Sequence, residues 1–264
     1  MNTKPEETLK DKLSSGRTVY GSCITSGTSA RRNAAIGCGL DFVFVDTEHI
    51  SLDRGELSQI CHIYQANHIT PIVRILSPDP YRASQAIDDG AVGVIAPYLE
   101  TEDQIRDLVG ATKLRPLKGE KLKRIQNGSE LISDDLKCYL EEYNRGILTI
   151  ANIESNPAVD NLERLLSIDG LDAVFIGPHD LSINMGIPEQ YDHPDFIAAV
   201  RSIIKAARKH TLGVGIHFSL EPERQIFWIR EGVNIVIHSS DMALFEQKLK
   251  ADLYVIRTAA GDVD

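Results

Sequence analysis

The sequence lacks the features that mark a disulfide-bonded, membrane or nucleotide-binding protein. Its four cysteines show no CxxC spacing and do not cluster with histidines, which favours reduced thiols over disulfides or a zinc site. No apolar run approaches the roughly 18 residues of a membrane span, and the amino terminus has no apolar signal core. No GxGxxG or Walker loop follows an apolar run, which counts against nucleotide binding. We therefore expect a cytoplasmic protein with no membrane partner.

Positive charge is also scarce. There are 38 acidic residues against 28 lysines and arginines, so the net charge is −10. Because nucleic-acid phosphates bind basic surfaces, this balance argues against a nucleic-acid partner. The hydrophobic fraction of 42% and the charged fraction of 25% are ordinary for a soluble globular protein. We therefore expect no nucleic-acid partner, and the candidate site residues below indicate a small-molecule substrate.

Eight short apolar runs alternate with segments of helical spacing. The runs are rich in β-branched residues and apolar on both faces, as strands of a parallel sheet are. Capping signals, such as Asp53 with Glu56 three residues later, mark helix starts. Eight such repeats predict an α/β fold, a single (β/α)8 TIM barrel spanning residues 1–264. The expected strands are 19–24, 42–45, 71–75, 92–96, 147–153, 173–176, 214–218 and 234–238. The expected helices are a leading helix at 4–15, then 30–36, 53–66, 81–87, 102–111, 157–166, 195–209, 222–231 and 242–254.

Residues 113–145 break this rhythm, because a few residues suffice to join a helix to the next strand. The first part, KLRPLKGEKLKR, holds six basic residues in an acidic protein. Two interpretations are open: a long solvated loop, or a lid or anion-binding edge near the active-site face. The polar tail at 258–264 is expected to be disordered.

Two of the expected strands are followed by a carboxylate at their carboxyl ends. Glu154 follows the strand at 147–153, and Asp180 follows the strand at 173–176. Ligands bind at the carboxyl ends of parallel barrel strands, so the two acids are placed to hold one cation. Oxygen ligands alone suit Mg²⁺ or Mn²⁺ better than zinc, and leave roughly four positions for water and a 2-oxo acid. The alternative is that each acid caps the helix that follows it.

Other ionisable groups follow neighbouring strands. Arg74 ends the third strand, where its anionic partner is either a substrate carboxylate or enolate, or else Asp46 or Glu48. His49 follows the second strand and is a candidate general base, because imidazole titrates near neutrality. It can also be a plain polar loop residue. Asp88 is a candidate for orienting His49 through a hydrogen bond.

The chain resembles the HpcH/HpaI aldolase family of the pyruvate and phosphoenolpyruvate barrel superfamily, over about residues 9–249. The resemblance rests on motifs in the family's order, namely DFVFVDTEH at 41–49, PIVRI at 71–75, IDDGAVGVIAPYLETEDQ at 87–104, NIESNPAVDNLE at 152–163 and LDAVFIGPHDLS at 171–182. It implies a modified barrel whose C-terminal helix is exchanged between subunits of a homo-oligomer, from dimer to hexamer. It also implies a class II, metal-dependent aldolase that joins a pyruvate enolate reversibly to an aldehyde.

The resemblance also implies roles for individual residues. Glu154 and Asp180 match the metal ligands, for Mg²⁺ or Mn²⁺ with Co²⁺ as a further option. Arg74 matches the arginine that contacts the keto oxygen and the enolate. His49 matches the histidine that performs acid and base work, and Asp88 matches its carboxylate partner.

The substrate carboxylate is expected on the backbone amides around His179 and Asp180, because these match the family's amides at the start of a helix. Asp46 and Asn152 are expected to support the site from behind its ligands. Asn152 stands where the family commonly has the longer glutamine. His179 stands where the family often has a small residue, so the half of the site that receives the second substrate looks altered.

The leading hypothesis is therefore a carbon–carbon lyase that cleaves or forms 4-hydroxy-2-oxo acids through a pyruvate enolate. The alternative is another enolate reaction at the same site, such as citrate-synthase-like condensation or oxaloacetate decarboxylation. The basic segment at 113–124 favours an anionic second substrate. A third hypothesis, a non-catalytic barrel, is weak because every metal and enolate residue is present.

Overall fold

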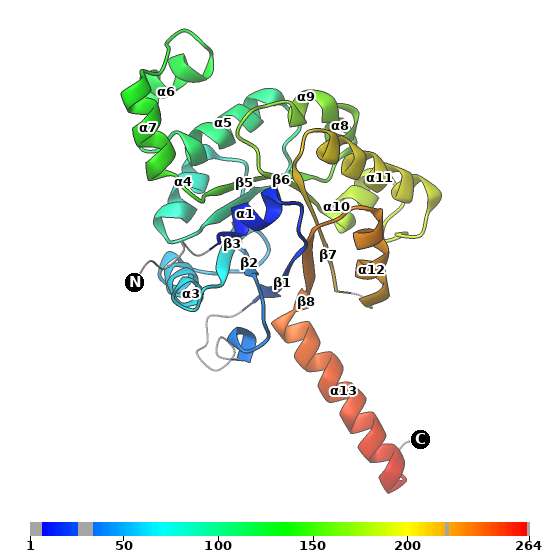
Figure 1. Ribbon diagram of the computed structural model, residues 1–264. Helices are drawn as coiled ribbons and strands as arrows, with labels where there is room; N and C mark the ends of the chain where they lie inside the picture. The colour runs from blue at the N-terminus through cyan, green and yellow to red at the C-terminus, as the bar shows by residue number, and fades with distance from the viewer. Residues whose placement is uncertain (1–6, 26–33, 220–221, 263–264) are drawn as a thin grey trace.

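Eight parallel strands close into a barrel in chain order, β1 to β8, with helices around the outside (Figure 1). The structure is a computed structural model and describes residues 7–25, 34–219 and 222–262. It confirms the predicted (β/α)8 fold. The strands are β1 Val19–Ile24, β2 Phe42–Asp46, β3 Thr70–Arg74, β4 Gly93–Ala96, β5 Leu148–Ile153, β6 Ala173–Ile176, β7 Gly213–Phe218 and β8 Ile235–Ser240.

The helices follow the predicted segments closely. The leading helix α1 is shorter than predicted, and the predicted helix at 157–166 is two short helices, α8 and α9. The first part of the predicted helix at 30–36 lies outside the described residues, while 34–36 are helical. The helices are α1 Leu9–Ser14, α3 Arg54–Ala66, α4 Pro80–Asp88, α5 Glu102–Lys113, α6 Gly119–Gln126, α7 Asp134–Tyr143, α8 Asn156–Asp160, α9 Leu162–Leu166, α10 Pro178–Asn184, α11 Pro194–Lys209, α12 Pro222–Glu231 and α13 Asp241–Ala260.

The barrel buries two layers of side chains because its strands are apolar on both faces. In β2, Phe42 and Phe44 belong to the cluster inside the barrel, whereas Val43 and Val45 belong to the cluster between the strands and the outer helices. This alternation is the period of two that every β-strand imposes. It explains why the strand sequences read as continuous apolar runs.

The segment 113–145 is not the predicted loop, because it contains α6 and α7. It also does not lie near the active-site face. The segment connects the end of α5 to the start of β5, and the Lys113 ammonium bonds the Ile147 carbonyl and Asp172, just before β5 and β6. It therefore lies at the amino ends of the strands, and Figure 1 shows α6 and α7 at the outer edge of the molecule.

The basic side chains of this segment are neutralised locally. Five of the six form ion pairs with acids of the same segment or of its neighbours at the amino face, so no open anion-binding edge results. These pairs are Lys113–Asp172, Arg115–Asp88, Lys121–Glu130, Lys123–Glu120 and Arg124–Glu130.

The chain ends in α13, which extends away from the barrel beyond β8 (Figure 1). The helix continues to Ala260 and ends at Gly261, whose φ of 80° is the left-handed conformation common after helix ends. The prediction of a disordered tail at 258–264 was therefore wrong for its first residues. Residues 263–264 lie outside the described residues. Within the described ranges, no helix is long and apolar enough to cross a membrane.

Candidate active site

The inward-facing positions of the strands change from apolar to polar at the carboxyl end of the barrel. In β2 the inward residue Phe44 is followed two positions later by Asp46, and in β3 Ile72 is followed by Arg74. Strand register pairs Asp46 directly with Arg74. Because side chains two apart share a face, the strands that build the core also deliver these two charges into the barrel mouth.

The same alternation operates in β5, β6 and β7. Ile150 packs inside the barrel, so Asn152 and then Glu154 continue the inward row of β5. The corresponding positions are Gly177 after β6 and His217 in β7. One polar layer thus caps the inner core.

Arg74 is buried and forms an ion pair that the sequence left open as an alternative. Its Nε and Nη2 donate to Asp46 Oδ1 and Oδ2 at 3.0 and 2.6 Å, and its Nε also lies 3.3 Å from Glu48 Oε2. Burial acts to raise the pKa of Asp46, but the hydrogen bonds and charge of Arg74 outweigh it and hold that pKa below its usual value. The guanidinium is therefore held rigidly at the barrel mouth.

Glu154 is a buried carboxyl group, 1% exposed, and none of its hydrogen-bond partners among the described residues is cationic. Its Oε1 accepts from the Tyr98 backbone N–H at 2.9 Å, and its Oε2 accepts from Asn152 Nδ2 at 2.7 Å. Burial raises its pKa to about 7, and the nearby charge of Asp180 adds to this rise. Gly177 is required beside it, because a Cβ atom there would overlap Glu154 Oε2.

Tyr98, after β4, ties the two candidate metal ligands together and was missed in the sequence. Its hydroxyl donates to Asp180 Oδ1 at 3.1 Å while its backbone N–H binds Glu154. Its φ of 47° is unfavourable for a residue with a side chain, and such conformations persist where the surrounding structure determines them. The signal available in the sequence was the position of Tyr98 in the motif at 87–104, two residues after the last residue of β4.

The pair Glu154 and Asp180 fits a divalent cation. Two carboxylates lie close enough that the charge of Asp180 raises the pKa of Glu154, and a bound cation would remove that repulsion. Each Glu154 oxygen accepts one hydrogen bond and retains a lone pair for a metal. Among the residues that the structure describes, no group of three or more histidine, cysteine, aspartate or glutamate side chains forms a metal cluster. A two-carboxylate site leaves most coordination positions to water and substrate.

The structure does not bring Asp88 to His49. Asp88 is the last residue of α4, is 56% exposed and pairs with Arg115 at the amino face of the barrel. His49 lies at the opposite rim, 58% exposed, with its Nε2 3.7 Å from Glu48 Oε2. The role of Asp88 as partner of His49 therefore finds no support within one chain, and Glu48 is the carboxylate that lies beside His49.

A pocket of about 390 Å³ opens over this layer. Its lining includes Arg74, His49 and Asp180, together with His179 and Glu189 from the region of α10. Of the predicted site residues, Arg74, His49, His179 and Asp180 line the pocket, and Asp46 is bonded to Arg74. Glu154 is bonded to Asn152, and Tyr98 links it to Asp180 of the lining.

His217 also lines the pocket and is neutral at physiological pH. Burial lowers its pKa to about 4, and its Nε2–H donates to the Ser239 carbonyl oxygen at 3.2 Å. Phe44 lies beneath it, with ring centroids 5.8 Å apart. A neutral imidazole fixed in this way shapes the pocket and does not add charge to it.

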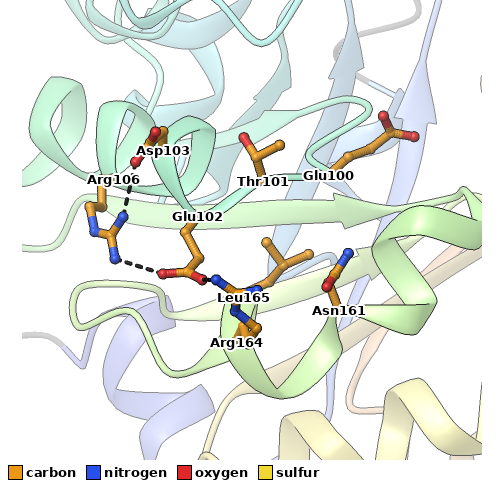
Figure 2. A pocket seen from close by; sticks show the side chains of 8 residues that line it. All are labelled: Glu100, Thr101, Glu102, Asp103, Arg106, Asn161, Arg164 and Leu165. Carbon is orange, nitrogen blue, oxygen red and sulfur yellow. Dashed lines mark hydrogen bonds and ion pairs between the residues drawn. The ribbon is translucent and has the colours of Figure 1, made fainter.

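A second hollow, of about 340 Å³, lies between α5 and α9 (Figure 2). Figure 2 shows Glu102 between Arg106 and Arg164, and its two oxygens lie 2.7 and 2.5 Å from their Nη2 atoms. Both arginines are therefore already paired with a carboxylate, and we assign no ligand to this hollow.

Comparison with known proteins agrees with this geometry. The family described as HpcH/HpaI aldolase/citrate lyase matches residues 25–246. The chain is 28% identical to a 2-dehydro-3,6-dideoxy-6-sulfogluconate aldolase of Pseudomonas putida, over 90% of this chain and 92% of that protein. It is 26% identical to a 2-keto-3-deoxy-L-rhamnonate aldolase of Salmonella gallinarum, over 98% and 96%. Among solved structures, the citrate synthase SbnG is similar with a TM-score of 0.82 and 25% identity, over 97% of this chain and all of that chain.

Proposed function

This chain belongs to the HpcH/HpaI aldolase/citrate lyase family and is a carbon–carbon lyase of the aldolase class; we propose that it forms and cleaves 4-hydroxy-2-oxo acids through a pyruvate enolate. The observation that carries this proposal is the pair Glu154 and Asp180, tied together by Tyr98 beneath the pocket. The two relatives above are both named as aldolases of 2-keto (2-dehydro) sugar acids, which supports a 2-oxo acid substrate.

We assign the cation to Glu154 and Asp180, with Mg²⁺ or Mn²⁺ as the preferred ions because the ligands are oxygen alone. When bound there, a divalent cation supplies Lewis acidity that favours the enolate form of a 2-oxo acid. Asn152 holds Glu154 Oε2 at 2.7 Å and so fixes one carboxylate in place.

Arg74 is the group that places positive charge next to the developing enolate oxygen. Its bonds to Asp46 hold the guanidinium plane, so little reorganisation is needed when substrate arrives. The substrate carboxylate is assigned to the amides of His179 and Asp180, because α10 begins without a side-chain cap that would occupy its first N–H groups. His49, exposed at the rim, is assigned the proton transfer to and from the incoming aldehyde oxygen.

Pyruvate exchange tests this proposal without knowledge of the second substrate. The protein would be incubated with Mn²⁺ and pyruvate in D₂O while the methyl signal is followed by NMR. We expect exchange with the wild type, and a loss of at least about a hundredfold in Glu154→Gln and in Asp180→Asn.

Glu120→Gln is the matched control, because Glu120 is exposed on α6 and its carboxylate contacts only Lys123 among the described side chains. Calorimetric titration with Mn²⁺ should show binding in the wild type and in this control, and weak binding in the two site variants. Absence of exchange with Mg²⁺, Mn²⁺ and Co²⁺ alike would contradict the proposed function.

The second candidate is a different use of the same enolate site, supported by the likeness to the citrate synthase SbnG. The basic segment at 113–124 no longer favours an anionic co-substrate, because it lies at the other end of the barrel. Assays with oxaloacetate, alone and with acetyl-CoA, separate the candidates. Decarboxylation or condensation faster than aldol cleavage would select the second.

A further inference from the structure

Two side chains of the pocket lining have no part in the proposed enolate chemistry. His179 Nε2 lies 3.6 Å from Glu189 Oε1, and both side chains line the pocket. Both are more than half exposed, at 59% and 68%, so a solute entering the pocket reaches them. This pair lies beside Asp180, at the place where a second substrate would approach an enolate held there.

The pair is held by one buried hydroxyl group. Ser182 Oγ donates to the His179 carbonyl oxygen at 2.8 Å and accepts from the Glu189 backbone N–H at 3.0 Å. Ser182 is fully buried. The same atom therefore fixes the backbone of both residues relative to each other.

The connection that carries Glu189, between α10 and α11, is also fixed on its far side. Arg224 of α12 donates to both Asp192 carboxylate oxygens, at 3.1 and 3.0 Å. Tyr191 packs edge-on against Phe218 of β7, with ring centroids 5.3 Å apart. Glu189 is thus presented to the pocket by a well-anchored connection.

Glu189 adopts a backbone conformation that favours glycine. Its φ is 57°, in the left-handed region where a Cβ atom is disfavoured. A glycine there would remove the strain, yet the chain has a charged side chain directed at the pocket. Strain of this kind, where the surroundings enforce it, points to a function for the side chain.

The charges that line the pocket decide which second substrate the Glu189 side chain can accept. Among the lining residues that the structure describes, Arg74 is the one lysine or arginine, and its charge is already paired with Asp46 and Glu48. The Glu189 carboxylate accepts hydrogen bonds from hydroxyl groups and repels a second anion.

We infer that Glu189, placed by its contact with His179, selects the second substrate and favours an uncharged hydroxyaldehyde over an aldehyde that carries a carboxylate or phosphate. This inference rests on the proposed aldolase function. Discrimination of this kind works through repulsion of the wrong partner as much as through attraction of the right one.

The test compares two acceptors of equal length, glycolaldehyde and glyoxylate, in condensation with pyruvate and Mn²⁺. We expect the wild type to have the higher kcat/KM with glycolaldehyde. In Glu189→Gln, which keeps the size of the side chain, the ratio should move toward glyoxylate by about fivefold or more. The difference should shrink at high salt, since screening weakens interactions between exposed charges.

Two further variants separate the effect of the Glu189 carboxylate from the effect of its backbone conformation. Glu189→Gly removes the carboxylate and the backbone strain together and should shift the ratio in the same direction, while the surface control Glu120→Gln should not shift it. Pyruvate exchange in D₂O, which needs no acceptor, is measured on each variant. An unchanged ratio in Glu189→Gln and Glu189→Gly with exchange still present would overturn this inference alone, whereas no exchange in the wild type would overturn the aldolase function itself.

Discussion

At the scale of single residues, the site depends on a carboxyl group that is costly to bury. Glu154 is 1% exposed and is hydrogen-bonded by the Tyr98 backbone N–H and by Asn152, with no cation in direct contact among the described side chains. Its pKa of about 7 follows chiefly from burial. A carboxylate buried in this way destabilises the folded protein, but it is a good ligand for a metal.

The raised pKa predicts how stability depends on pH in the absence of metal. Glu154 titrates near 4.5 when unfolded and near 7 when folded, so between these values the folded protein binds a proton that the unfolded chain releases. Its contribution to stability is therefore fully present below about pH 4.5 and is lost as the pH rises through 7. Urea unfolding with EDTA at pH 5 and pH 8 should show this loss, up to about 3 kcal/mol.

Glu154→Gln is the control for this prediction, because a neutral amide of the same shape cannot titrate. The variant should lose less stability than the wild type between the two pH values. Mn²⁺ added at pH 8 should restore the wild type and leave the variant unchanged, since the metal binds the native carboxylate. Equal pH dependence of the two proteins would contradict the assignment.

At the scale of elements, the connections on the two ends of the barrel have different tasks. The connections after the strands carry Tyr98, His179 and Glu189, which meet at or beneath the pocket. The long connection of α6 and α7 precedes a strand, and it is attached to α5 by Asn144, whose Nδ2 donates to the Lys113 and Arg115 carbonyl oxygens at 2.9 and 2.8 Å. Only the first group can influence the chemistry directly.

Removal of α6 and α7 tests this division. Replacement of residues 117–143 by a short glycine–serine linker leaves Arg115 and Asn144 to close the connection. We expect pyruvate exchange within about twofold of the wild type, and a loss of stability of about 2 kcal/mol because the buried Leu140 is removed. A folded variant, judged by circular dichroism, that had lost exchange would instead support the lid interpretation.

At the scale of the whole molecule, α13 is exposed along its length in the part of the chain that the structure describes. None of its residues is buried, and Figure 1 shows it extending away from the barrel. Five of its apolar residues recur at intervals of three and four, so they form one stripe along the helix. The stripe is Met242, Phe245, Leu249, Leu253 and Ile256, exposed by 38 to 63%.

An apolar stripe of this length predicts that α13 packs against a second copy of the chain. Light scattering after size exclusion should give the mass of a dimer or a larger assembly for the wild type. The double variant Phe245→Glu and Ile256→Glu should give a smaller mass, because each change places a charge in the apolar contact. Gln247→Glu, at an exposed polar position of the same helix, should leave the mass unchanged, and a monomeric wild type would contradict the prediction.

Much of this protein was determined by local sequence. The eight apolar runs predicted the barrel, because a strand buried on both faces and a following helix each leave a pattern within a few residues. Glu154, Asp180, Arg74 and His49 were predicted at the carboxyl rim in the same way. A residue directly after a barrel strand must lie at the carboxyl rim, whatever the rest of the chain does.

Only the tertiary structure decided which of these groups meet. Tyr98 bonds Glu154 across 56 positions of sequence and Asp180 across 82, and these contacts depend on strand register and on the closure of the barrel. Asp88 was predicted to reach His49, but it ends a helix that runs back to the amino face. The sequence by itself therefore determined the fold and the ring of charged residues at its rim, while pairing, burial and the raised pKa of Glu154 came from packing between distant segments.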